Sequence, residues 1–281
     1  MLYAGGVGVR RFYPRPRFVV RRAQPLARQI DELSGKNSKN GIRKNAILRT
    51  TSELRGALMQ KALSLFDTTL GKKAIMALTG LVLLGFLLGH MLGNLQVYLG
   101  PATLDSYGEH LKALGPLLWA IRGILLLCFV LHGWMVISLY ARSTAARPIG
   151  YRKTQTVVTS YAAQLMWLSG IVILLFVVFH IAHFTFPGIA MSSSYVHDEH
   201  GKVFQNVVNA FQIPWVSGLY VLAMVILGTH IYHGAWSLLQ TLGISHPRYD
   251  GPLRGLAKTI AVVIVVGNCS IPLAVLAGLV K

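Results

Sequence analysis

Four histidines lie inside long apolar segments of the chain, and they are the residues best able to do chemistry: His90, His132, His180 and His233. A lipid hydrocarbon core excludes ionisable side chains unless a partner compensates them, so histidines in membrane-length segments are candidates for functional residues. Imidazole is a ligand of haem iron, which takes one axial ligand on each face. Histidines at matching depth on neighbouring helices therefore predict haem binding.

The positions of the four histidines within their segments pair them. If the chain enters the membrane from the cytoplasmic side, the first and third segments run outward and the second and fourth return. His90 and His180 then lie near the outer ends of their segments, and His132 and His233 lie near the inner ends. The pattern predicts two haems, an outer one held by His90 and His180 and an inner one held by His132 and His233.

Other residues leave alternatives to this assignment open. His183 and His230 each lie three residues from a candidate ligand on nearly the same helix face, and a register shifted by one turn would put them in place of His180 and His233. Arg122 lies early in a membrane segment, where it would pair with a haem propionate or extend to lipid headgroups. Proton-relay histidines of a transporter, or histidines buried only for packing, are the alternatives to haem ligands.

Glycines lie beside three of the candidate ligands. They are Gly85, Gly89 and Gly93 near His90, Gly133 next to His132 and Gly234 next to His233. Glycine allows a flat porphyrin to approach the helix backbone closely, which favours the haem interpretation. Helix–helix packing through the same glycines is the competing explanation.

The segments that carry these residues are long enough to cross a membrane. Of the 281 residues, 53% are hydrophobic and only 13% are charged, and the mean hydropathy is +0.53. That composition is too apolar for a soluble domain of this size, and a spanning helix needs about 20 apolar residues. Five stretches qualify: residues 74–97, 116–140, 161–183, 214–240 and 256–280. Strand-length alternation is absent, so we expect an all-α integral membrane bundle of five transmembrane helices.

The net charge of +18 is unevenly distributed along the chain. Most of the 27 basic residues lie before the first span, between the second and third spans, or between the fourth and fifth. This positive-inside pattern predicts a cytoplasmic N-terminus and an outside C-terminus, in the inner (cytoplasmic) membrane of a cell. We expect anionic lipid headgroups and acidic partner surfaces, and not nucleic acid, next to this charge.

The chain divides into three predicted parts. Residues 1–45 are rich in Arg, Pro, Gly and Asn without periodicity, which predicts a disordered basic arm, with an organelle transit peptide as the alternative. Residues 46–73 mix leucines and basic residues in a helical rhythm, typical of an amphipathic helix on the cytoplasmic membrane surface or against a partner subunit. Residues 74–281 form the predicted five-helix, haem-binding membrane domain.

Cysteine and glycine patterns limit what this chain does by itself. Cys128 and Cys269 fall inside apolar segments and match no disulfide, zinc or iron–sulfur spacing, and no Cys-x-x-Cys-His motif for covalent haem attachment occurs. A dinucleotide-binding glycine loop is also absent. We therefore expect any flavin or iron–sulfur chemistry to reside on another chain.

Several short motifs in order resemble one family. They are Met76–Gly80 with Gly89-His90-Met91, Ala146-Arg147-Pro148 with Tyr151, Ser169-Gly170 through His180, and the run from His233 to Gly243. Over residues 72–280 this set is similar to the succinate dehydrogenase cytochrome b subunit, in the five-helix, di-haem form shared with quinol:fumarate reductases. The resemblance agrees with the depth argument, since it assigns His132 and His233 to the proximal haem and His90 and His180 to the distal haem.

The resemblance also implies partners and a quinone. The chain would pass electrons between an iron–sulfur subunit and membrane quinone, expected to be menaquinone, while an FAD flavoprotein subunit oxidises succinate on the cytoplasmic side. Among residues near the outer ends of the first two helices, Glu109 is the candidate acid for quinol protons and Asp105 is the second candidate. The alternatives are a di-haem cytochrome b anchor of a hydrogenase or formate dehydrogenase, a haem-free proton-coupled transporter, and a purely structural anchor.

Overall fold

The computed structural model describes residues 48–56, 66–147, 149, 161–185, 202–244 and 246–281. The chain separates into two units, Met1–Leu63 and Ser64–Lys281. In the first unit the structure describes one helix, residues 48–56, within the range predicted to be amphipathic and helical. The predicted basic arm, residues 1–45, lies outside the described residues.

Five helices of the second unit are long and apolar enough to cross a membrane, and no strand occurs in the described part of the chain. They are α3 (Thr69–Asn94, continued by the 3-10 helix η2, Leu95–Leu99), α5 (Pro116–Ala145), α7 (Met166–Phe184), α9 (Pro214–Thr241) and α10 (Asp250–Leu276). Large apolar side chains on them lie on the outside, including Leu92 at 61% exposed and Leu126 at 64%. The predicted all-α, five-span fold is confirmed: this is a multi-pass membrane protein whose helices contact lipid.

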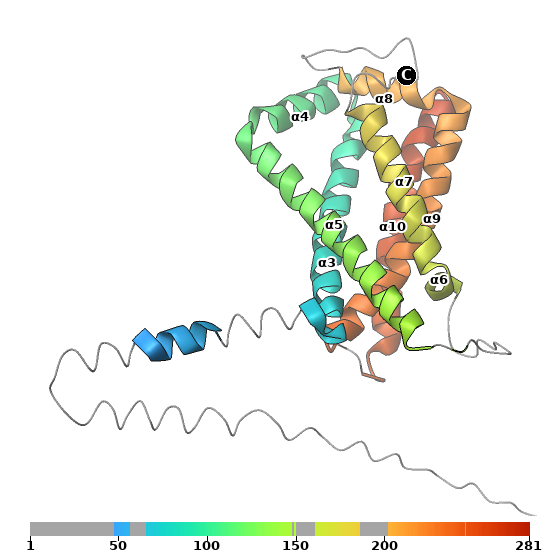
Figure 1. Ribbon diagram of the computed structural model, residues 1–281. Coiled ribbons are helices and arrows are strands. Elements are labelled where there is room, and N and C mark those ends of the chain that lie inside the picture. The colour runs from blue at the N-terminus through green and yellow to red at the C-terminus, as the bar shows by residue number, and fades with distance from the viewer. Residues whose placement is uncertain (1–47, 57–65, 148, 150–160, 186–201, 245) are drawn as a thin grey trace, which may run out of the picture. The chain divides into compact units, whose positions relative to one another are not determined.

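Three shorter helices complete the described elements: α4 (Pro101–Ala113), α6 (Tyr161–Gln164) and α8 (Val203–Phe211). Helices α4 and α8 lie together at the end of the bundle that also carries the C-terminus, which we call the α4–α8 end (Figure 1). Helix α6 leads into α7 at the other end of the bundle (Figure 1). The two segments between spans that contain α4 and α8 are thus partly helical.

Local sequence explains where the helices begin and end. The Thr68 side chain accepts a hydrogen bond from the backbone N–H of Gly71 at 3.1 Å, which caps the start of α3 five residues before the predicted boundary at residue 74. Proline is the first residue of α5 and of α9, where it has no N–H to leave unpaired. The predicted third span is divided, because α6 ends at Gln164 and α7 begins at Met166.

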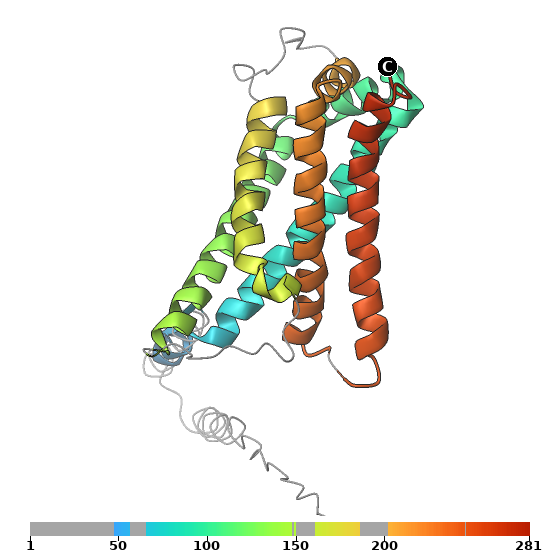
Figure 2. The same cartoon turned by 90° about the vertical axis from the view of Figure 1, so that its right-hand side faces the viewer.

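Helix α9 is at the centre of the packing. It packs against α7 on one side and α10 on the other, and α3 packs against α5, α9 and α10 (Figure 2). The close approach of α9 and α10 depends on Gly228, because the side chain of Val265 occupies the space that a Cβ there would need. The arrangement brings side chains of α3 and α7, and of α5 and α9, toward one another.

Candidate functional site

The rings of His90 on α3 and His180 on α7 lie next to each other near the α4–α8 end. Their centroids are 5.8 Å apart and the ring planes are nearly perpendicular, at 84°. Phe86 stacks on His90 and Phe176 stacks on His180, so both rings are held between helices among aromatic neighbours. The structure thus brings together the two histidines that the sequence paired as outer ligands.

His132 on α5 lies against His230 on α9. Their ring centroids are 6.4 Å apart, with 56° between the planes. His230 was the alternative to His233, which lies three residues further along α9 and is also half-buried. The contact therefore favours His230 as the partner of His132, whereas the role of His233 as a ligand stays a prediction.

The two pairs occupy different depths in the bundle. His90 and His180 each lie four residues before the last residue of their helices, α3 and α7, which end at the α4–α8 end. His132 and His230 each lie 16 residues after the first residue of helices that begin at that same end. At 1.5 Å per residue, the first pair is about 6 Å from its helix ends and the second about 24 Å from its helix starts.

Hydrogen bonds set the tautomers of the second pair. Nδ1 of His132 lies 3.1 Å from the carbonyl oxygen of Met76, which can only accept, so this nitrogen carries the proton. Nδ1 of His230 lies 3.1 Å from Ser169 Oγ, and the single hydroxyl proton of Ser169 is donated to the Met166 carbonyl. His230 therefore donates as well. Each neutral ring then keeps its lone pair on Nε2, as is usual for metal-binding histidines with a protein partner at the other nitrogen.

The first pair has different partners. Nδ1 of His180 lies 3.3 Å from the Tyr220 hydroxyl, and Nδ1 of the neighbouring His183 lies 3.1 Å from the same hydroxyl. At His90 the engaged nitrogen is Nε2, which accepts from the Asn94 side-chain amide at 3.0 Å. A metal bound through Nε2 of His90 would take the place of that amide.

Three polar residues beside the histidines were not identified as site residues from the sequence: Tyr220, Asn94 and Ser169. The sequence of a membrane span does not show which neighbouring helix a polar side chain faces.

The separations of the rings fit iron ligation. A metal–nitrogen bond to histidine is about 2 Å long, so the ring centroids of two imidazoles on opposite sides of one metal ion lie roughly 6 Å apart. Both observed separations, 5.8 and 6.4 Å, are of this size. Among the described residues no cluster of three or more His, Cys, Asp or Glu could hold a bare metal ion. Pairs of imidazoles are the donor set for an iron whose other four ligands come from a macrocycle.

The backbone around the pairs also suits a flat group. Among the five spans, close backbone contacts join α9 to α10, α3 to α5, α7 to α9, and α3 to both α9 and α10. The histidine pairs instead join α3 to α7 and α5 to α9, whose backbones have at most weak contact. A Cβ added at Gly85, Gly89, Gly133 or Gly234 would meet no atom of the described residues within 4 Å, so contacts among those residues do not explain these glycines. Gly93 differs, since Tyr107 packs against it.

The other predicted site residues lie at the α4–α8 end. Arg122 is exposed, and its guanidinium carbon lies 5.0 Å from the ring centroid of Trp119. Glu109 is exposed on α4. Asp105 is half-buried, and its Oδ1 accepts a hydrogen bond from the backbone N–H of Phe204 at 2.8 Å, so it caps the first turn of α8. The roles of Arg122 and Glu109 toward a haem or quinone stay predictions.

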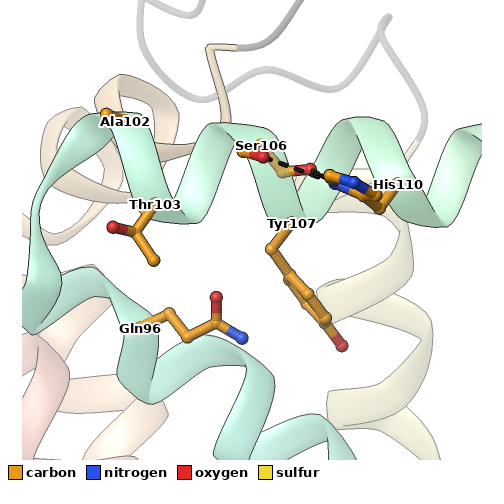
Figure 3. Close-up of a pocket in the computed structure, with 6 residues that line it drawn as sticks. All are labelled: Gln96, Ala102, Thr103, Ser106, Tyr107 and His110. Carbon is orange, nitrogen blue, oxygen red and sulfur yellow. Dashed lines mark hydrogen bonds between the residues drawn. The ribbon is translucent and has the colours of Figure 1, made fainter.

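A pocket of about 490 Å³ opens beside α4 and η2 at the same end. Figure 3 shows Thr103 and Tyr107 extending from α4 toward Gln96 of η2, with Ser106 and His110 along the same helix. Nδ1 of His110 donates to the Ser106 carbonyl at 2.7 Å. The lining residues offer several polar groups to a ligand but do not include Glu109 or Asp105.

No family model, curated protein or solved structure matches this chain. The resemblance to the cytochrome b subunits, read from the ordered motifs, therefore stays a prediction. What the structure adds is geometric: two pairs of neighbouring imidazoles at two depths among membrane-spanning helices.

Proposed function

We propose that this chain is the membrane-anchor cytochrome b subunit of a succinate:quinone oxidoreductase in the cytoplasmic membrane. The observation that carries the proposal is the pair of imidazole contacts, with ring centroids 5.8 and 6.4 Å apart. Buried histidines without a metal or an ionisable partner are rare in membrane spans. A proton relay is less favoured, because the hydrogen-bond and ring partners that these four histidines have among the described residues include no acid.

His90 with His180 would hold one b haem, and His132 with His230 the other. The bound haems would supply one-electron chemistry, with potentials set by the bis-imidazole ligation and the low dielectric around it. The chain's own contribution is to fix the rings and exclude water. The Met76 carbonyl and Ser169 Oγ hold Nδ1 of His132 and His230, which leaves Nε2 of both rings available.

The pocket beside α4 is our candidate for the quinone headgroup. A quinone carbonyl accepts hydrogen bonds, and Gln96, Tyr107 and Thr103 carry groups that donate them. His110 lines the pocket and can exchange a proton, whereas its neighbour Glu109 lies outside the lining. His110 and Glu109 are both candidates for the proton-handling residue. Glu109 precedes His110 on α4 and its side chain is exposed, so it could exchange protons with His110 through solvent.

An iron–sulfur subunit, with its FAD flavoprotein, would dock at the end opposite α4 and α8. Helix α5 ends there, the connection between α9 and α10 lies there, and α10 begins there. These segments carry exposed basic residues: Arg142, Arg147, Arg248, and Arg254 and Lys258 of α10. An acidic partner surface would be attracted to them, and the attraction would weaken with salt. The positive-inside pattern makes this end cytoplasmic.

The test is a dithionite-reduced minus oxidised spectrum of the purified full chain, with haem quantified as the pyridine haemochrome. We expect two b haems per chain. One haem would mean that one histidine pair is structural, and a protein with no haem after expression in a haem-sufficient host would contradict the cytochrome function and favour a transporter. Co-purification from native membranes then distinguishes a succinate:quinone oxidoreductase anchor from the anchor of a hydrogenase or formate dehydrogenase. We expect the chain to co-purify with a succinate-oxidising flavoprotein.

A further inference from the structure

Tyr220 on α9 is the one tyrosine of the described residues whose hydroxyl joins two histidines. It lies 3.3 Å from Nδ1 of His180 and 3.1 Å from Nδ1 of His183. Tyr220 is only 6% exposed and His183 only 3%. Four phenylalanine rings surround the tyrosine ring with centroids between 5.0 and 6.1 Å away: Phe176, Phe179, Phe184 and Phe211. This packing holds the hydroxyl between the two imidazoles.

The number of protons available limits the tautomers that His180 and His183 can adopt together. A phenol has one proton, so toward two nitrogens it donates one hydrogen bond and accepts the other. Nδ1 is therefore protonated in one ring and unprotonated in the other. A neutral imidazole carries its single proton on one of its two nitrogens, so His180 and His183 hold opposite tautomers. At any moment only one of the two can present an unprotonated Nε2.

The surroundings decide which ring that is. His180 contacts His90, with 5.8 Å between centroids, whereas His183 stacks on Phe179 at 5.3 Å and lies at a tilt against Phe184 at 4.5 Å. The ring contacts of His183 within the described part of the chain are with Phe179, Phe184 and Tyr220. His180 is thus the ring with a second imidazole beside it for a shared iron.

We propose that Tyr220 is a positioning residue that selects His180 over His183 as the haem ligand. Its hydroxyl accepts from Nδ1 of His180, leaving Nε2 of that ring unprotonated, and donates to Nδ1 of His183, whose proton is then on Nε2. The inference rests on the proposed haem function and deepens it, because it distinguishes two histidines that lie three residues apart on one helix.

The first test uses Tyr220→Phe in the full chain, which removes the hydroxyl and keeps the ring, with Tyr232→Phe on the same helix as the matched control. Loss of a hydrogen bond to a metal-binding histidine weakens metal binding about 10- to 100-fold. We expect one of the two haems to dissociate about that much faster from Tyr220→Phe and its low-spin electron paramagnetic resonance signal to shift. The other haem, and both haems of Tyr232→Phe, should behave as in the parent protein.

A second variant, His183→Gln, should keep both haems, because His183 is not a ligand. A Tyr220→Phe protein with unchanged dissociation rates and signals, or a His183→Gln protein that loses a haem, would overturn the proposal.

Failure of the haem function itself gives a different result, namely no haem in the parent protein. In that case ¹⁵N magic-angle-spinning spectra of histidine-labelled protein, assigned with His180→Gln and His183→Gln, decide the role of Tyr220. Opposite tautomers for His180 and His183 that disappear in Tyr220→Phe support the positioning role. Identical tautomers in the parent protein contradict it.

Discussion

For single residues, the tautomers of His132 and His230 follow from hydrogen bonds to groups that can act in only one way. The Met76 carbonyl can only accept from His132, and Ser169 has given its proton to the Met166 carbonyl. An unpaired N–H in an apolar interior costs several kcal/mol, of the order of 2–7, so these partners hold the rings firmly. The same count of donors and acceptors applies at Tyr220, whose hydroxyl requires opposite tautomers of His180 and His183.

The partner of His132 can be tested directly, because His230 and His233 lie three residues apart. We expect His230→Gln to lose one of the two haems and to keep the other, since glutamine preserves the size of the side chain but is a poor ligand of haem iron. His233→Gln, the matched control, should keep both. Pyridine-haemochrome quantification of the purified variants measures the outcome, and the reverse result would restore the sequence-based pairing of His132 with His233.

At the scale of elements, α8 depends on a carboxylate from another helix. Asp105 of α4 accepts the backbone N–H of Phe204, and an anion there is favoured by the partial positive charge of the α8 N-terminus. We expect Asp105→Ala to destabilise α8 by about 1–2 kcal/mol. Amide hydrogen exchange in residues 203–211 should then be about 5- to 30-fold faster.

Glu109→Gln is the matched control, since Glu109 is an exposed acid on the same helix. It should leave exchange in α8 unchanged. If both variants exchange alike, the contact with Phe204 does not stabilise α8. Assaying quinone reduction in the two variants would also separate a capping role of Asp105 from a role of either acid in proton transfer.

The contact between α3 and α4 depends on a glycine. A Cβ at Gly93 would lie 2.6 Å from the Tyr107 hydroxyl oxygen and 2.8 Å from two ring carbons, and Gly93 is buried. We expect Gly93→Ala to destabilise the protein by about 1–3 kcal/mol, as overpacking does, and to displace Tyr107 from the pocket. Thermal unfolding in detergent measures the change.

Gly123→Ala is the control for that prediction. Gly123 is exposed on α5 and a Cβ there would meet nothing within 4 Å, so alanine should be neutral or stabilise the helix by about 0.5–1 kcal/mol. A melting temperature for Gly93→Ala equal to that of Gly123→Ala would mean that Tyr107 moves at little cost.

At the scale of the whole molecule, the two ends of the bundle differ in character. One end carries α4, α8, the pocket and the C-terminus, and the other carries the basic connection between α9 and α10 (Figure 1). Because positively charged loops stay in the cytoplasm, we expect Lys281→Cys to react with a membrane-impermeant maleimide in intact cells. Tyr249→Cys should react only after the membrane is opened.

The parent protein is the control for this labelling, since Cys128 and Cys269 lie inside α5 and α10. Labelling of Tyr249→Cys and protection of Lys281→Cys in intact cells would mean that the chain is inverted. The proposed iron–sulfur partner would then dock at the α4–α8 end.

The fold class follows from the sequence alone, as does the presence of histidines inside the apolar segments. Runs of about 20 apolar residues can satisfy their backbone in a membrane only as helices, so composition and length sufficed to predict the five spans and the histidines within them. The predicted ends were displaced by a few residues, as at Thr69, because capping is decided by local side chains such as Thr68. Helices α4 and α8 were not predicted, since short amphipathic helices are stabilised mainly by what they pack against.

Which side chains meet depends on how the helices pack. His230 and His233 lie on nearly the same face of α9, so their spacing cannot tell which of them reaches His132; the rotation and separation of α5 and α9 do. The position of Tyr220 between His180 and His183 likewise depends on how α7 packs on α9. Sequence sets the depth of a residue in a membrane helix through the rise per residue, but its partner across the bundle depends on helix packing, which is a property of several segments at once.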